Sequence, residues 1–117
     1  MKSHRELVVW QKSMQLVEEV YRLIKLLPRD EIFVLSDQLR RAAISVPSNI
    51  AEGNARGSER DFVRFLTIAQ GSNAELGTQL LICQRLGFIQ DADLRPALAL
   101  NEEVSKMLRS LIKSLKE

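Results

Sequence analysis

The sequence predicts an all-α protein, an antiparallel up-down-up-down four-helix bundle that forms a single domain over residues 1–117. Apolar residues recur every three or four positions in four long segments, a spacing that places them on one face of a helix. The composition is 45% hydrophobic and 27% charged, which suffices for a packed core, and only 5 Gly and 3 Pro interrupt it. The links between the segments are short, so successive helices are expected to run in opposite directions.

The first helix is predicted over about residues 7–27. Its apolar residues form two parallel rows, one of Trp10, Met14, Val17, Tyr21 and Ile24 and the other of Leu16, Val20, Leu23 and Leu27. Two rows are wide enough to face two neighbouring helices, so we expect both in the core. Pro28 closes this helix, because the residue before a proline avoids the helical conformation. The link that follows carries Ile32 and Phe33, which we expect to cover one end of the bundle.

The second helix is predicted over about residues 36–52. Ser36 is the candidate N-cap, and Gly53 is the expected left-handed residue that ends the helix. Pro47 lies inside the apolar pattern, where it removes a backbone hydrogen bond. We therefore expect this helix to be bent at Pro47.

The third helix is predicted over about residues 59–86. Ser58 and Asp61 resemble a capping box at its start, and Gly71 and Gly77 are expected to permit a close helix crossing. One row at helical spacing is predicted to be core, namely Phe62, Leu66, Ala69, Asn73, Leu76, Leu80 and Cys83. Further apolar residues lie on the other sides, namely Val63, Ile68, Ala74, Leu81, Ile82 and Leu86. Four helices cannot bury that whole circumference, so this helix is expected to form part of a subunit interface.

The fourth helix is predicted over about residues 93–115, after Gly87 has ended the third. Either Asp91 or Asp93 is expected to cap it. The choice of Asp93 leaves Pro96 in the first turn, where its missing N–H costs nothing. The predicted core row of this helix consists of Ala97, Asn101, Val104, Leu108, Leu111 and Leu115.

The residue types needed for catalysis are sparse. His4 is the only histidine and lies near the start of the chain, and Cys83 lies in a core row, where an inert thiol is expected. Glu52 and Glu75 have the most apolar surroundings among the acids, and a structural pair with arginine is favoured for both over a general-acid role. We therefore predict no enzymatic activity, no catalytic residues, no cofactor and no metal site. Because no apolar run is long enough to span a membrane, we expect no membrane partner and a cytoplasmic location.

Arginine is the only strongly basic residue in the middle of the chain. Every lysine lies before residue 26 or after residue 105. Arginine suits bidentate pairing, stacking and phosphate contact better than lysine does. Acidic residues are interspersed, so salt bridges and a nucleic-acid patch both remain open. The glycine-containing corner at residues 53–58 precedes a helix N-terminus, and a plain turn is favoured there over a phosphate site.

Four segments of the chain resemble the four-helix-bundle family of proteins encoded in intervening sequences of bacterial 23S ribosomal RNA genes: LVVWQKSMQLVEEVY, QLRRAAISVPSNIAEG, RDFVRFLTIAQGSNAEL and KMLRSLIKSL. The resemblance implies a bundle that assembles into a ring and favours a homopentamer. The family is similar in fold to the accessory protein of diversity-generating retroelements, a ring that binds nucleic acid and a reverse transcriptase. Asn73 departs from the apolar residue expected after Gly-Ser, which predicts either a looser core layer or a polar contact.

The resemblance carries no catalytic residues, but it covers the polar positions Arg40, Arg41, Asn49, Glu52, Gly53 and Arg56. Our candidates for a nucleic-acid or subunit interface are the charged and amide residues of this set together with two further arginines, namely Arg40, Arg41, Asn49, Glu52, Arg56, Arg60 and Arg64. We predict a non-enzymatic homo-oligomer that binds RNA or a nucleic-acid–protein complex. The alternative is a protein–protein scaffold that binds no nucleic acid. Replacing Arg40 and Arg41 with alanine should weaken RNA binding in the first case and break the oligomer in the second.

Overall fold

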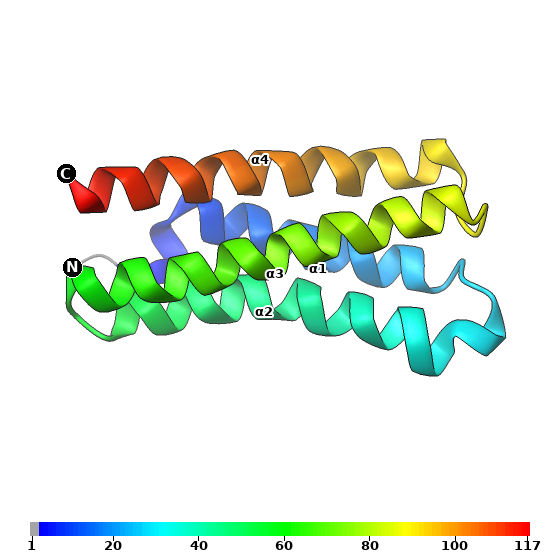
Figure 1. Cartoon of the computed structure of the whole chain (residues 1–117), viewed down its shortest axis with the longest axis horizontal. Coiled ribbons are helices and arrows are strands. Elements are labelled where there is room, and N and C mark those ends of the chain that lie inside the picture. The colour runs from blue at the N-terminus through cyan, green and yellow to red at the C-terminus, as the bar shows by residue number, and fades with distance from the viewer. Residues whose placement is uncertain (1–2) are drawn as a thin grey trace.

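The computed structural model describes residues 3–117 and contains no β-strand within them. Four long helices make up most of this range: α1 (Val8–Ile24), α2 (Asp37–Ala55), α3 (Glu59–Arg85) and α4 (Asp91–Lys116). Two 3₁₀ turns, η1 (His4–Glu6) and η2 (Arg29–Glu31), and one π-helical turn, η3 (Ile32–Ser36), lie between or before them. The molecule measures 43 × 23 × 20 Å, and the helices follow its long axis (Figure 1).

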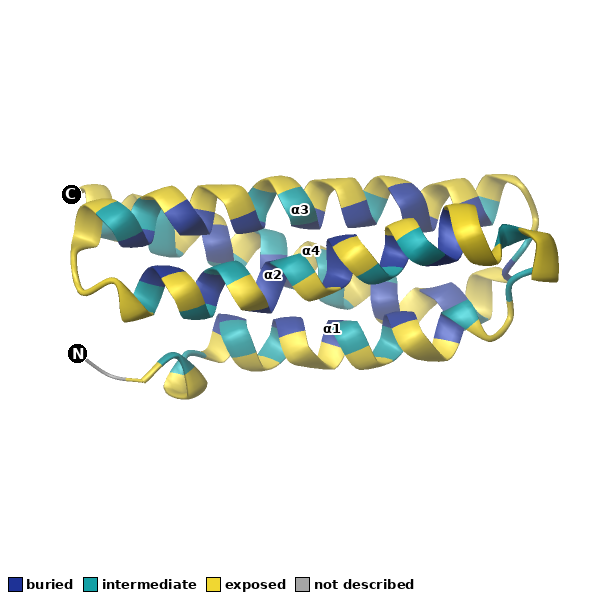
Figure 2. Cartoon of the chain, turned by 90° about the horizontal axis from the view of Figure 1, so that it is seen from below, coloured by how far each residue is buried: buried dark blue, intermediate teal, exposed yellow. Residues whose placement is uncertain are grey.

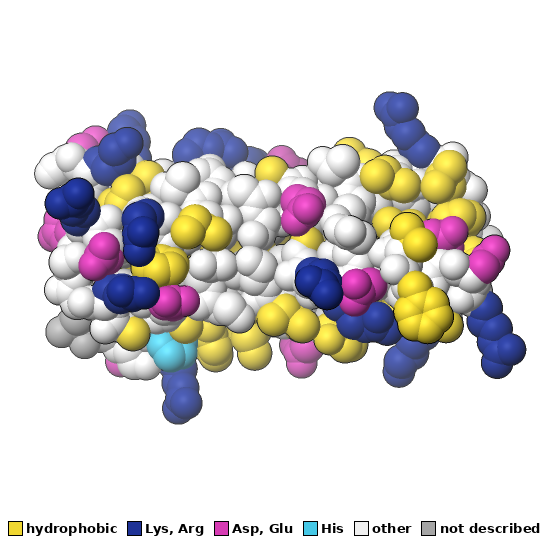
Figure 3. Space-filling view, turned by 60° about the horizontal axis from the view of Figure 1, so that its bottom comes forward, with side chains coloured by type: hydrophobic (Ala, Val, Ile, Leu, Met, Phe, Trp, Pro, Cys, Tyr) yellow, Lys and Arg dark blue, Asp and Glu magenta, His cyan; other side chains and the backbone are white. Residues whose placement is uncertain are grey.

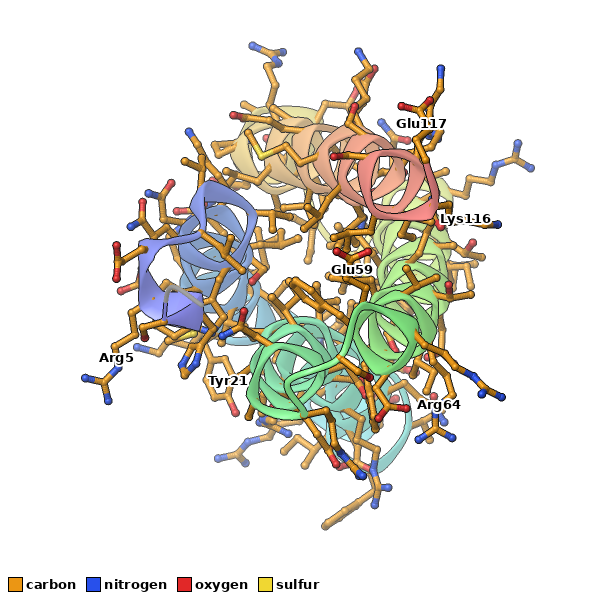
Figure 4. The ribbon with its side chains drawn as sticks, turned by 90° about the vertical axis from the view of Figure 1, so that its left-hand side faces the viewer. Arg5, Tyr21, Glu59, Arg64, Lys116 and Glu117 are labelled. Atoms are coloured by element: carbon orange, nitrogen blue, oxygen red, sulfur yellow. The ribbon has the colours of Figure 1, made fainter. Side chains whose placement is uncertain are left out.

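Each long helix packs against two others around a shared core. Both α1 and α3 lie against α2 and α4, and a view along the bundle shows the four helices surrounding a common interior (Figure 4). In Figure 1 the start of α1 and the end of α4 lie at the same end of the bundle. The buried positions of all four helices face inward (Figure 2).

The core row predicted for α3 is confirmed. All seven of its members are buried, from Phe62 to Cys83. Most of the apolar residues predicted on the other sides of this helix are not covered within one chain. Ile68, Leu81 and Ile82 are each exposed by 39% or more, whereas Val63 is half-buried. The expected excess of apolar surface on α3 is therefore present.

The prediction for the first helix is confirmed for one of its two rows and only in part for the other, in which Trp10, Val17 and Ile24 pack half-buried against the core. Leu16, Val20 and Leu23 are buried, but Met14 and Tyr21 are exposed by 40% and 41%. The reason is geometric, since the main helix contacts of α1 are with α2 and α4, and the row that begins at Trp10 faces the outer side of the α1–α2 contact. The helix also stops at Ile24, before its predicted end at residue 27, because the chain passes into a turn.

The link between α1 and α2 also departs from its prediction. Ile32 is 45% exposed and Phe33 is 91% exposed, so these side chains do not cover the end of the bundle. Ser36 is buried but caps nothing, because the π-helical turn η3 leads straight into α2 with helical dihedral angles at Ser36. The buried anchor of this link is Leu35.

Gly53 does not end α2. The helix continues through Pro47 and Gly53 to Ala55, and the left-handed glycine is Gly57, with φ of 84°. Gly53 instead serves packing, because a Cβ atom there would lie 2.7 Å from the Cβ of Phe65. The corner that follows supplies Ser58 as the N-cap of α3, and its hydroxyl accepts a hydrogen bond from the Asp61 N–H at 3.2 Å, as predicted.

The start of α4 differs from the prediction because its two aspartates contact other elements. Asp91 accepts a hydrogen bond from the Gln84 side chain at 3.1 Å, and Asp93 lies 3.7 Å from the guanidinium of Arg22. The helix therefore begins at Asp91 after an uncapped Gln90. This earlier start places Pro96 beyond the first turn, where it removes one backbone hydrogen bond of the helix.

A pair of amides, the buried Asn73 and the half-buried Asn101, joins α3 to α4. Asn73 Nδ2 donates to the backbone carbonyl of Asn101 at 2.9 Å, and Asn101 Nδ2 donates to the backbone carbonyl of Asn73 at 2.8 Å. Gly77 leaves room for this pair, because a Cβ atom there would lie 2.5 Å from Asn101 Oδ1. Gly71, the other glycine expected at a close crossing, has no such neighbour within 4 Å. The departure from the family pattern at Asn73 therefore provides a polar contact.

Candidate nucleic-acid interface

The structure divides six of the seven candidate residues into two separate groups and leaves Asn49 apart from both. Arg40 and Arg41 lie near the start of α2, whereas Glu52, Arg56, Arg60 and Arg64 surround the corner between α2 and α3. From Arg41 to Arg56 the helix rises by about 22 Å at 1.5 Å per residue. The candidates therefore form two sites, not one continuous patch.

The corner between α2 and α3 holds the denser group, which we call the arginine corner (Arg56, Arg60, Arg64 and Phe65). The guanidinium carbons of Arg56 and Arg64 lie 5.0 Å and 4.9 Å from the centre of the Phe65 ring. Phe65 itself is only 7% exposed, so the ring is a fixed base for both arginines. Cation–π contact of this kind holds a guanidinium while leaving its N–H groups free for other partners.

The charges of the arginine corner are only partly neutralised. Arg56 Nη2 lies 3.0 Å from Glu52 Oε2, an exposed pair within one helix. Within residues 3–117 neither Arg60 nor Arg64 has an ion pair. Both line a depression of about 530 Å³ together with Ser58 and Asp61. Arg64 projects outward from α3 in Figure 4.

The arginines near the start of α2 have partners within the chain. Arg41 Nε lies 3.1 Å from Asp37 Oδ2, one helical turn earlier. Arg40 lies over the Tyr21 ring of α1, at 6.0 Å from its centre. Exposed ion pairs are weak, so this group remains able to meet an anion, but it is less available than the arginine corner.

Asn49 has a structural contact and does not join either group. Its side-chain N–H donates to the Ser45 carbonyl at 2.8 Å and to the Ser45 hydroxyl at 3.0 Å. The Ser45 hydroxyl in turn lies 2.8 Å from the Ser72 hydroxyl, which links α2 to α3. Asn49 therefore supports the helix contact from the outer side.

The groups considered for catalysis have little reactive character. Burial raises the pKa of the Cys83 thiol to about 11, so it stays protonated near neutral pH. Glu52 and Glu75 are both exposed, and Glu52 pairs with Arg56. In the part of the chain that the structure describes, no cluster of three His, Cys, Asp or Glu side chains is placed to hold a metal ion, and no helix is long and apolar enough to cross a membrane.

Two features of the site were missed in the sequence. No local pattern marks Phe65 as part of the site, because its role depends on Arg56, nine positions away across the turn. Tyr21, which the helical spacing predicts to lie in the core, instead supports Arg40 at the surface. The adjacency of Arg64 and Phe65 was the only local signal for the arginine corner.

The fold and this surface define a class: a small all-helical bundle with exposed arginines at one corner. The chain belongs to the 23S rRNA-intervening sequence protein family, whose model matches residues 5–110. Among solved structures, it is similar to a protein of unknown function from the S23 ribosomal protein family of Bacteroides thetaiotaomicron VPI-5482. The two share 29% identity with a TM-score of 0.83, over 90% of this chain and 98% of that chain. No curated protein matches the sequence.

Proposed function

We propose that this protein is a non-enzymatic, homo-oligomeric bundle of up-down-up-down topology that serves as an accessory binding module for RNA or a ribonucleoprotein. The observation that carries the proposal is the arginine corner, where Arg56 and Arg64 stack on Phe65 and Arg60 lies beside them. Arginines held by an aromatic ring lose less freedom when they contact phosphates. The proposal includes a cytoplasmic location and a ring, with five subunits favoured by the family resemblance.

A bend of α2 at Pro47 is part of the same proposal. The proline has no N–H to donate within the helix and is buried near the middle of α2. A bend there would turn the two ends of α2, which carry the two arginine groups, relative to one another. Comparing crystal structures of the parent and of Pro47→Ala would measure it, and an unchanged helix axis would contradict it.

The arginine corner is tested by RNA binding at several salt concentrations. Fluorescence anisotropy with a short labelled RNA hairpin would compare the parent with Arg60→Ala/Arg64→Ala. Two lost phosphate contacts should weaken binding and lower the slope of log K against log salt by about 1 to 2. Arg95→Ala/Arg109→Ala removes the same charge from α4 and is the matched control. Equal binding by the parent and the corner variant at every salt concentration would exclude this site.

The second arginine group is expected to contribute less. Arg40→Ala/Arg41→Ala should weaken binding by a smaller factor, because Arg41 is already paired with Asp37 and Arg40 with Tyr21. A larger loss than at the corner would move the main contact to the start of α2.

A protein scaffold is the second candidate function, and the exposed apolar residues of α3 favour it. In that case the arginines close subunit contacts, so the same substitutions should lower the mass of the oligomer. Light scattering after size exclusion, with and without the hairpin, separates the two candidates. A parent oligomer that gains no RNA mass even at low salt would favour the scaffold.

A further inference from the structure

An apolar protrusion lies at the end of the bundle opposite the start of α1 and the end of α4. We call it the knob, and it consists of Ile32, Phe33 and Val34, exposed by 45%, 91% and 62%. Apolar side chains gather at this end of the surface in Figure 3, the end at which η3 lies in Figure 1. Burying exposed apolar side chains of this size is favourable. The π-helical turn η3 holds the knob outward, because the buried Leu35 and Ser36 fix its base.

An apolar groove lies between α1 and α2, on the outer side of their contact. It has a volume of about 350 Å³ and is lined by His4, Trp10, Met14, Val17, Ile44, Pro47, Ser48 and Ala51. The His4 ring meets the Trp10 ring edge-on, with centroids 5.1 Å apart. Met14 and Ile44 are 40% and 43% exposed, so the groove walls present apolar surface to solvent. An aromatic side chain suits a groove with aromatic and methionine walls.

The knob cannot occupy the groove of its own chain. It lies beyond the end of α1 and before the start of α2, whereas the groove residues Trp10 and Ala51 lie toward the opposite end of those helices. From Val34 to Ile44, the nearest groove residue on α2, the chain rises by about 15 Å along the helix axis. An occupant must therefore come from another molecule.

The charges beside the two surfaces are complementary. Asp30 and Glu31 come directly before the knob, and Arg5 follows His4 at one end of the groove. These three residues have no ion pair within residues 3–117. One molecule thus carries an apolar protrusion that follows two acidic residues and an apolar groove with an arginine next to one end.

We infer that the knob of one copy of this chain inserts into the α1–α2 groove of the next copy, with Phe33 packed against Trp10 and Met14. This inference rests on the homo-oligomer of the proposed function and specifies its contact. Because knob and groove are different surfaces, the contact is head-to-tail and leaves one knob and one groove free. Repetition of the contact closes a ring when the rotation between copies permits it.

The test compares masses by light scattering after size exclusion, without RNA. Phe33→Asp removes the knob, and Met14→Lys/Ile44→Lys blocks the groove. We expect both variants to fall from the mass of the parent oligomer to the monomer mass of 13.3 kDa. Both are expected to keep the parent's helical circular dichroism, because the replaced side chains are exposed. Val8→Asp and Val8→Lys, at a 54% exposed residue of α1 that does not line the groove, are the matched controls and should leave the oligomer intact.

Mixing the two variants gives the decisive measurement. The groove of the Phe33→Asp variant is intact, and so is the knob of the groove variant. A head-to-tail contact therefore predicts that an equal mixture forms a dimer of twice the monomer mass and grows no further. A mixture that stays monomeric would overturn the pairing of this knob with this groove, as would controls that dissociate equally.

The remaining outcomes separate this inference from the proposed function. A parent that is itself a monomer would overturn both the inference and the oligomeric part of the proposed function. A parent oligomer that Phe33→Asp leaves unchanged would overturn the inference alone. Neither result alters the salt-dependent RNA measurement on the arginine corner, which is made with different substitutions.

Discussion

The two sides of α2 meet their neighbours in different ways. Toward α3, Gly53 lies against the Cβ of Phe65, and the hydroxyls of Ser45 and Ser72 meet at 2.8 Å. Toward α1, the larger side chains Trp10 and Met14 stay partly exposed beside an open groove. Small residues let two backbones approach until no gap remains, whereas large residues at the edge of a contact hold the groove open. One side of α2 therefore maintains the fold, and the other is available to a partner.

The largest effect is expected from Gly53→Ala. The new methyl group would meet Phe65 Cβ at 2.7 Å and Phe62 Cδ1 at 3.1 Å, so α2 and α3 must move apart. Overpacking of this kind should lower the free energy of unfolding by about 1–3 kcal/mol. Urea denaturation followed by circular dichroism measures it. An unchanged or higher stability would mean that the α2–α3 contact is looser than the structure indicates.

A smaller loss is expected from Ser45→Ala. It removes the hydrogen bond to Ser72 and one acceptor of Asn49, for a loss of about 0.5–1.5 kcal/mol. Ser48→Ala, at an exposed residue of the same helix, is the control and should change stability by no more than about 0.5 kcal/mol. Thermal unfolding of both variants makes the comparison. Equal melting temperatures would show that the hydrogen bond between Ser45 and Ser72 does not stabilise the fold.

Gly71→Ala should stabilise the protein. Gly71 is exposed on α3, and no other side chain or helix lies within 4 Å of a Cβ atom placed there. The helix propensity of alanine then adds about 0.5–1 kcal/mol to the free energy of unfolding. The sign should be opposite to that of Gly53→Ala under the same urea titration. A lower free energy of unfolding for Gly71→Ala would indicate that another residue lies close to this position, contrary to the structure.

The smallest effect is expected on the open side of α2. In the Phe33→Asp background, Met14→Lys should change the free energy of unfolding by about 0.5 kcal/mol or less, because Met14 is 40% exposed and the lysine stem can cover the same surface. Guanidinium denaturation of the two proteins measures the difference. A loss comparable to that of Gly53→Ala would show that the groove wall is part of the core.

The difference between the two sides also explains how far the sequence could predict the fold. The core row of α3 was predictable, because Phe62 to Cys83 repeat at helical spacing and all are buried. The two rows of α1 have the same spacing and the same apolar character. Which of them faces the core depends on where α2 and α4 lie, which no local pattern contains.

The candidate site was predictable only as a set of residue types. The arginines of the middle segment are where the sequence places them, but their division into two groups follows from the length of α2. The role of Phe65 beneath Arg56 and Arg64 depends on a contact across the corner. The exposure of Phe33 could not be predicted from the sequence either, since an apolar residue in a short link is ordinarily expected to pack against the core.

The Asn73–Asn101 pair has a consequence for how the chain selects its arrangement. The leucines of α3 and α4 repeat at the same spacing, so sliding one helix along the other by a turn of about 5.4 Å would exchange one apolar contact for a similar one. The same slide would separate the two amides and leave the buried Asn73 side chain without its partner, at about 1–3 kcal/mol for each unmet buried group. These two side chains thus favour the native alignment of α3 and α4 over alignments shifted by one turn. The apolar side chains around them would make similar contacts in either alignment.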